Sequence, residues 1–387
     1  MNVAQKIDTC TGCGVCAAVC PSAAVKMQPD AHGFLCPIVD DAACTDCGLC
    51  TEKCPVSVLP QVSVHTDVMT GYAKDGALLP QSSSGAIFPV LAAEIIRRGG
   101  LVFGAAFDGQ FHVIHTAAES VEELPALCSS KYVQGRIPSD CYAQVKAALA
   151  AGRWVYFSGM PCHIAALKSY LGRKYETLIT QDTACHSVPS PLVWEGYKEE
   201  LEKQHSGKLT AFSFRNKANG WEAYHIRAAF DNGREFAQPA AESPYQRGFI
   251  KGLYSRSSCF VCKFKGIERC SDITLADYWG VKGIQPDAYN PQGTSLVLIH
   301  SEKGRSLLEG CKDQLQLQPA AKDAFSFNPA VLTPIQKPAR YDEFWEGYGQ
   351  TAFADLVSAC CEPTEEELAQ ERRSKSLLAR VMRRLKR

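Results

Sequence analysis

One cysteine spacing occurs twice near the start of the chain and constrains the fold more than any other feature. Each copy reads Cys-x2-Cys-x2-Cys-x3-Cys-Pro, and the copies occupy residues 10–21 and 44–55. In such a run the first three thiolates bind one [4Fe-4S] cube, whereas the fourth, followed by proline, binds the other cube. The sequence therefore predicts two clusters whose ligands cross over between the copies. The cluster I ligands are Cys10, Cys13, Cys16 and Cys54, and the cluster II ligands are Cys44, Cys47, Cys50 and Cys20.

Three other chemistries use closely spaced cysteines, and each fits less well. Zinc sites pair two Cys-x2-Cys arms and need no third cysteine in each run. Disulfides would require export, and the sequence opens with no charged-then-apolar leader. A radical enzyme that splits S-adenosylmethionine would need a further cysteine where Ala23 stands. The doubled run instead resembles bacterial two-cluster ferredoxins.

Composition limits the partners and the compartment. Lys plus Arg and Asp plus Glu are balanced at 41 each, so the net charge gives no reason to expect nucleic-acid binding. Nineteen cysteines without an exporting leader indicate a reducing compartment, and we expect a cytoplasmic protein. The most apolar stretch, residues 90–107, is interrupted by Glu94, Arg97 and Arg98, so it falls short of the ~18 apolar residues that a membrane span needs.

A serine run after the ferredoxin-like segment is the first candidate site for an organic cofactor. Ser82, Ser83, Ser84 and Gly85 precede a helical pattern over residues 86–98. Free backbone N–H groups, hydroxyls and the helix dipole at such a start suit a phosphate or the pyrophosphate of a flavin. The alternative is an ordinary serine N-cap. Residues 56–64, which lead toward this region, alternate apolar and polar residues and predict a strand.

Two further residues are candidates for the same cofactor. Lys131 and Tyr132 follow a helix predicted to begin near Ser120, where a cation and an aromatic ring could contact a phosphate or a ring system. A solvated lysine is the more common role for such a residue. From these residues alone, both interpretations stay open.

Residues 153–190 predict a strand, turn, helix, strand and turn, with a cysteine in each turn. Cys162 and His163 lie where a strand over residues 153–158 gives way to a helix over residues 164–171. Cys185 and His186 follow the next strand. Ligands collect beyond the carboxyl ends of strands in open α/β sheets, so the two cysteines could share one ligand. The alternative is that each is an inert buried thiol.

A Cys-x2-Cys pair flanked by lysines completes this set. Cys259 and Cys262 could bind zinc or half of a cube, and together with Cys162 and Cys185 they supply the four thiolates of a third [4Fe-4S] cluster. Cys270 could replace one member.

The order of these segments resembles the coenzyme F420 hydrogenase/dehydrogenase beta-subunit family over roughly residues 72–303, with a ferredoxin module in front. The motifs that carry the resemblance are Gln-Ser-Ser-Ser-Gly at 81–85, Ser-Lys-Tyr-Val-Gln at 130–134, Ser-Gly-Met-Pro-Cys-His at 158–163, Asp182 with Cys185-His186, Phe-Arg-Asn-Lys at 214–217 with Gly220-Trp221, residues 256–262, Ser-Asp-Ile-Thr at 271–274, Asp-Tyr-Trp-Gly at 277–280 and Gly-Thr-Ser at 293–295. Met160 and His163 depart from the family pattern Gly-Thr-Pro-Cys-Gln, so the partner of the flavin stays open.

The resemblance implies the fold, the cofactors and the division of the chain. It implies an α+β or α/β protein in which a small bacterial-ferredoxin-like domain precedes a larger mixed-sheet domain. The serine run with Lys131 and Tyr132 would hold a flavin, FAD rather than FMN, beside the third cluster. The expected segments are a ferredoxin-type domain (1–62), an N-terminal flavin-binding region (63–152), a C-terminal region with the third cluster (153–340) and a helical extension (341–387).

The implied activity is that of an iron-sulfur flavoprotein oxidoreductase. The flavin would exchange a hydride with an organic substrate or deazaflavin, and the clusters would pass single electrons to ferredoxin or another redox protein. The rival is a non-catalytic electron-transfer subunit of a larger complex. His163 and His186 are candidate proton relays, with packing as the alternative role. The basic amphipathic tail, residues 371–387, is a candidate for peripheral membrane contact or a solvated helix.

Overall fold

The computed structural model describes residues 3 and 8–364. The predicted tail at residues 371–387 lies outside these described residues. Among them, no helix combines the length and the apolar character needed to cross a membrane.

The two cysteine runs fold in the same way. Each run enters a one-turn helix, α1 (Val15–Ala18) or α2 (Leu49–Glu52), through a glycine in the left-handed region: φ is 76° at Gly14 and 75° at Gly48. Glycine adopts this conformation without the Cβ clash of other residues. Between the runs, β1 (Val25–Pro29) and β2 (Leu35–Val39) form an antiparallel hairpin. The predicted strand at residues 56–64 is wrong, because this segment is irregular and Ser63 N–H bonds instead to the carbonyl of Arg269.

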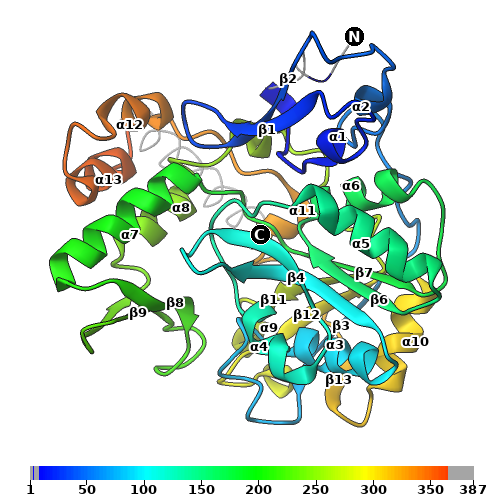
Figure 1. Cartoon of the computed structure of the whole chain (residues 1–387). Helices are drawn as coiled ribbons and strands as arrows, with labels where there is room; N and C mark the ends of the chain where they lie inside the picture. The colour runs from blue at the N-terminus through cyan, green and yellow to red at the C-terminus, as the bar shows by residue number, and fades with distance from the viewer. Residues whose placement is uncertain (1–2, 4–7, 365–387) are drawn as a thin grey trace, which may run out of the picture.

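An eight-stranded mixed sheet forms the centre of the larger part (Figure 1). Its middle is parallel, with β4 beside β6, β6 beside β7 and β7 beside β11, while the remaining pairs are antiparallel. In order across the sheet the strands are β13 (Leu315–Pro319), β3 (Asp67–Ala73), β12 (Ser295–Ile299), β11 (Ile273–Asp277), β7 (Leu178–Thr183), β6 (Val155–Gly159), β4 (Leu101–Phe107) and β5 (Val113–Ala118).

Helices cover both faces of this sheet. One core joins strand residues such as Val102 and Ile179 to α3 (Ile87–Arg97), α4 (Leu124–Leu127) and α10 (Glu302–Gly310). The alternate strand residues, such as Phe103 and Phe157, pack against α5 (Ser139–Ala150) and α6 (Pro161–Leu171). The second core also contains Cys13 and Val15, so the ferredoxin-like region packs on α5 and α6.

A separate three-stranded antiparallel sheet packs against helices in a third hydrophobic core. It consists of β8 (Leu209–Asn216), β9 (His225–Phe230) and β10 (Glu235–Pro239). Its aromatic core, which includes Trp194, Phe214 and Tyr245, joins it to helices. Figure 1 shows these helices beside the sheet. These helices are α7 (Pro191–His205), α8 (Pro244–Lys251), α12 (Tyr341–Gly347) and α13 (Phe353–Cys361).

The predicted fold class is confirmed: the protein is a mixed α/β structure with a large mixed sheet and an N-terminal ferredoxin-like region. The eight-stranded sheet takes β3, β4 and β5 from residues 63–152 and its other strands from residues 153–340. The four domain boundaries stay predictions. Other short elements are α9 (Val281–Ile284), α11 (Pro329–Leu332) and the 3-10 turns at Val121–Glu123, Ser257–Val261 and Pro286–Ala288.

Candidate functional site

The cysteines assigned to cluster I lie together across the two runs. Burial raises the pKa of the Cys13 thiol to about 12, and the neighbouring thiolate charges of Cys10 and Cys54 act in the same direction. Burial, Cys13, Cys10 and Cys54 together raise the pKa of Cys16. Cys54 comes from the second run, so the structure brings together the crossed set that the spacing predicts. The positive charge of bound iron would offset this repulsion, so the thiols could bind as thiolates.

The cysteines assigned to cluster II line one small cavity. Its wall includes Cys44, Cys47 and Cys50 of the second run together with Cys20 of the first. Cys47 is exposed, whereas the other three are half-buried. Four thiol groups that converge on one cavity fit the ligand set of a cube.

The four cysteines proposed for a third cluster also converge. Cys162 begins α6 beside Pro161, Cys185 follows β7, and Cys259 and Cys262 lie in and after the 3-10 turn Ser257–Val261. Burial raises the pKa of Cys162 well above its usual value, and the negative charges of Cys185, Cys262, Cys13 and Cys259 add to the effect. The four thiols are therefore mutual neighbours, and a cluster I ligand adjoins them.

Cys270 is placed differently. Burial raises the pKa of its thiol to about 11, but the charged neighbours of the thiol are Lys168, Asp182 and Arg269 rather than other cysteines. In residues 3 and 8–364, no three His, Cys, Asp or Glu side chains are grouped so as to hold a metal ion. A cube has a different requirement, because its four thiolates bind four separate irons.

A cavity of about 580 Å³ adjoins the third cysteine set. This volume lies within the usual range for cofactor and ligand pockets. Its wall brings together the predicted cofactor residues Ser82, Ser83, Ser84, Lys131 and Tyr132. Gly85 lies just behind them, where its N–H bonds to Ser295 Oγ and an added Cβ would come within 2.5 Å of the Gly71 carbonyl.

The same wall contains residues from two iron-sulfur ligand loops. Cys185 belongs to the third cysteine set, and Thr11 lies between the cluster I cysteines Cys10 and Cys13. A molecule bound in the cavity would therefore contact both loops.

Several buried polar atoms on residues that line this cavity have no hydrogen-bond partner in the protein. Seven of the residues that carry such atoms line its wall, and unsatisfied buried groups are costly unless a ligand or water pairs with them. The atoms are Thr11 Oγ1, Ser82 Oγ, His115 Nδ1, Gln134 Nε2, His163 Nδ1, Arg215 Nε and Gln246 Oε1. This donor and acceptor set fits a large polar cofactor.

The serine run does not cap α3. The N-cap residue is Ala86, which has a positive φ of 58° and no side-chain cap bond, so the N-cap alternative is wrong. Ser83 Oγ instead lies 2.8 Å from Ser130 Oγ and accepts a 2.7 Å bond from Ser130 N–H. Ser84 Oγ donates to Thr294 O over 2.8 Å. The run therefore joins two loops at the cavity edge and leaves Ser82 Oγ unpaired.

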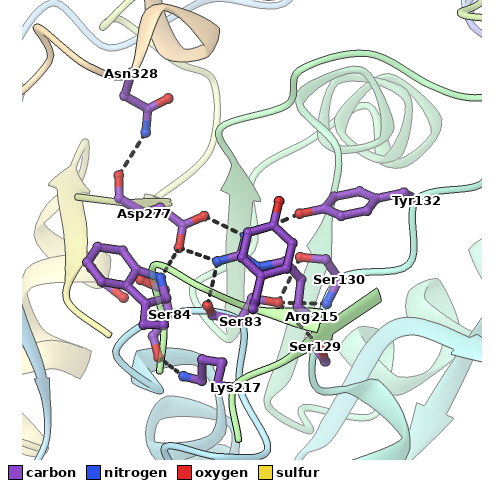
Figure 2. Close-up of polar contacts among 12 residues, drawn as sticks. Ser83, Ser84, Ser129, Ser130, Tyr132, Arg215, Lys217, Asp277 and Asn328 are labelled. Atoms are coloured by element: carbon purple, nitrogen blue, oxygen red, sulfur yellow. Dashed lines mark hydrogen bonds and ion pairs between the residues drawn. The ribbon is translucent and has the colours of Figure 1, made fainter. Parts of the chain in front are cut away.

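Arg215 organises the polar end of the cavity (Figure 2). Its guanidinium forms an ion pair with Asp277 at 3.0 Å, contacts Tyr132 Oη at 3.2 Å and donates to Ser83 O at 2.9 Å. Tyr224 and Trp279 stack near it, with the guanidinium 4.3 Å and 5.2 Å from their rings. This arrangement holds Ser83 and Tyr132 in place and leaves Arg215 Nε unpaired.

Lys131 is a half-buried cation rather than a fully solvated one. Its ammonium donates to Cys128 O at 2.8 Å, and burial lowers the pKa of the side chain to about 8. Lys217 lies behind the serine run, where it donates to Ser84 O at 2.9 Å, and burial followed by the charge of Arg215 lowers its pKa to about 7. Near neutral pH Lys131 is mostly protonated and Lys217 is partly protonated, so both can contribute positive charge near the cavity.

Three histidines line the cavity, and only two of them were candidates from the sequence. His163 contacts His115 with 5.1 Å between ring centroids, and burial lowers their pKa values to about 3 and about 4, so both rings are neutral at pH 7. His115 Nε2 donates to Ser158 O, which leaves Nδ1 as an unpaired acceptor. His186 Nε2 donates to Ile250 O at 3.1 Å. His115 could not be found from its sequence, because it occupies an ordinary strand position in β5.

Comparisons with known proteins match two parts of the chain. Residues 9–58 match a 4Fe-4S dicluster domain, and residues 152–323 match the C terminus of the coenzyme F420 hydrogenase/dehydrogenase beta subunit. A solved structure titled "Xenon derivatization of the F420-reducing [NiFe] hydrogenase complex from Methanosarcina barkeri" aligns over 81% of this chain and 93% of that chain, with 14% identity and a TM-score of 0.44. No curated protein matches. The resemblance seen in the sequence is confirmed: residues 9–58 are similar to a 4Fe-4S dicluster domain, and residues 152–323 are similar to the C-terminal region of the coenzyme F420 hydrogenase/dehydrogenase beta-subunit family.

Proposed function

We propose that this protein is an iron-sulfur flavoprotein oxidoreductase that exchanges a hydride with an organic substrate or a deazaflavin and single electrons with a redox protein. The observation that carries the proposal is the shared wall of the 580 Å³ cavity, which includes Thr11 of the cluster I loop and Cys185 of the third cysteine set. A flavin supplies two-electron chemistry at such a position, while cubes carry one electron each.

The residues of the cavity can be assigned to the parts of FAD by their chemistry. Ser82 offers an unpaired hydroxyl, Ser83 and Ser84 line the wall beside it with Gly85 behind them, and Lys131 offers positive charge, which together suit the pyrophosphate. Tyr132 and Arg215 lie at the same polar end of the cavity, and the hydrogen bond between them fixes the cavity wall there. FMN would leave more of the cavity and of its unpaired polar atoms unused, which favours FAD.

His163 and His186 could hold or pass a proton beside the bound cofactor. His163 Nδ1 is buried without a protein partner and is a neutral acceptor or donor at pH 7. His186 is anchored through Nε2, so only its other nitrogen is available. His163 is therefore the stronger candidate, and His115 beside it belongs to the same proposed pair.

Electrons would leave or enter through the ferredoxin-like region. Cluster I would lie inside, because Cys13 adjoins Cys162 of the third set. Cluster II would lie outside, because Cys47 is exposed at its cavity. A ferredoxin or another redox protein would therefore dock near Cys47. We further propose a cytoplasmic location, in which thiolates remain available to metals.

One anaerobic preparation of the full chain tests the cofactor content. We expect about twelve irons, a matching amount of sulfide and about one FAD per chain, and no zinc. About eight irons without flavin would contradict the proposal. Bleaching of the flavin by a reduced deazaflavin in the absence of other proteins would support an enzyme, whereas reduction only within a complex would support an electron-transfer subunit.

A further inference from the structure

Arg256 joins the loop of cluster I to the loop of the third cysteine set. Its Nε donates to Cys10 O at 2.5 Å, and its Nη2 donates to Cys36 Sγ at 3.1 Å. Its own carbonyl accepts the N–H of Cys259 at 2.9 Å, at the start of the 3-10 turn that carries this cysteine. One residue therefore contacts a cluster I ligand through its side chain and a third-set ligand through its backbone.

The guanidinium is buried and has no carboxylate partner among the described residues. Arg256 is 3% exposed, and its described contacts are carbonyl oxygen, sulfur and the Phe34 ring, whose centroid lies 5.4 Å from the guanidinium. Its Nη1 has no hydrogen-bond partner. A buried guanidinium without a counter-ion is costly. Its presence here therefore indicates that negative charge lies nearby when the clusters are bound. A cube with four thiolate ligands supplies such charge.

The turn at Gly12 lets this contact form. Gly12 has a φ of +70°, and a Cβ there would lie 3.0 Å from Arg256 Nη1 and 2.3 Å from Gln134 Nε2. The unpaired Nη1 therefore reaches the cluster I loop between Cys10 and Cys13.

We propose that Arg256 is a positioning residue that couples cluster I to the third cluster and raises the reduction potentials of both. A reduced cube is more negative than an oxidised one, so a nearby fixed cation stabilises the reduced form. Electrons arriving at either cube would therefore be retained between the flavin cavity and the exposed cluster II. This inference rests on the third cluster of the proposed function.

The test is a redox titration followed by electron paramagnetic resonance, on the full chain loaded with iron and sulfide under anaerobic conditions. R256Q removes the charge but keeps a polar side chain. We expect the potentials of cluster I and the third cluster to shift downward, while that of cluster II, whose cysteines do not contact Arg256 in the described residues, stays unchanged. R227Q is the control, because Arg227 pairs with Glu235 on the surface of the small sheet.

Two outcomes would overturn the inference. The iron content of wild type and variant distinguishes both outcomes from failure of the proposed function. R256Q with about twelve irons and unchanged potentials would show that Arg256 tunes neither cube. If wild type holds only about eight irons, the third cluster itself is absent. R256K is measured in parallel, because it keeps the positive charge and the backbone contact with Cys259. Both of its potentials should therefore stay near those of wild type, and a downward shift of both in R256K would overturn the inference even if R256Q loses iron.

Discussion

The hydroxyl of Tyr142 donates a hydrogen bond to the main-chain carbonyl of Cys13 over 2.7 Å. Tyr142 lies on α5 and is fully buried, and Cys13, Cys141, Cys162 and Cys16 surround it closely enough to act on its phenol. Burial, followed by these charges, raises its pKa well above 10, so the phenol stays protonated and remains a donor. This bond therefore fixes the ferredoxin-like loop at the point where two cysteine sets meet.

Y142F should weaken this junction. The substitution keeps the ring but leaves the buried Cys13 carbonyl without its partner, which costs about 1–3 kcal/mol. We expect a lower apparent unfolding temperature and faster release of iron to a chelator. Y170F is the matched control, because Tyr170 stacks on Tyr142 but lies at the edge of this core. Equal iron release from the two variants would contradict the role assigned to the hydrogen bond.

The ferredoxin-like region could be predicted from sequence because short loops determine it. The distance between cysteines and the glycine before each helix are local features, and both copies behave alike. The third cysteine set was also predictable in part, because Cys162 and Cys185 follow neighbouring parallel strands. That they meet Cys259 and Cys262 depends on tertiary packing, and that packing also leaves Cys270 among charged side chains.

The strand order of the large sheet, the conformation of the serine run and the contacts of Arg256 all depend on long-range contacts. β3 lies between β12 and β13, and these pairings span more than two hundred residues that no local pattern connects. The serine run resembled an N-cap, but tertiary bonds to Ser130 and Thr294 determine its conformation. Arg256 was visible only as part of a family motif, because its contacts with Cys10 and Cys36 require the docked loop.

C162S should remove one cluster and leave two. The serine hydroxyl is a poor replacement for a thiolate ligand, so iron content should fall from about twelve to about eight per chain while the ferredoxin-type signals persist. C270S is the control: Cys270 is buried, but its neighbours are charged groups rather than the four cysteines. Iron and sulfide analysis checks both variants. Equal loss from C270S would mean that Cys270 belongs to the ligand set.

S82A should separate stability from cofactor binding. Ser82 Oγ is buried without a partner, so its removal should stabilise the flavin-free chain by about 1 kcal/mol, whereas it should weaken retention of the flavin. S84A should instead destabilise the flavin-free chain, because it loses the hydrogen bond to Thr294 O. Thermal unfolding without flavin and fluorescence of released flavin measure the two effects. A destabilised S82A chain would show that Ser82 Oγ has a structural partner.

The pH dependence of stability should report on Lys131. Its folded-state pKa of about 8 lies below the usual 10.5, because burial disfavours the charged form. Between pH 8 and pH 10.5 the unfolded chain therefore binds more protons at this site than the folded chain, so this lysine makes stability rise with pH across that window. K131M and K131R have no group that titrates in this window. The unfolding temperature of wild type should therefore rise relative to that of either variant from pH 8 to pH 10. The lost bond to Cys128 O adds only an offset that does not change with pH. A difference that stays constant over this range would show that the Lys131 ammonium is solvated in the folded protein, and it would then be a poor candidate for holding a phosphate inside the cavity.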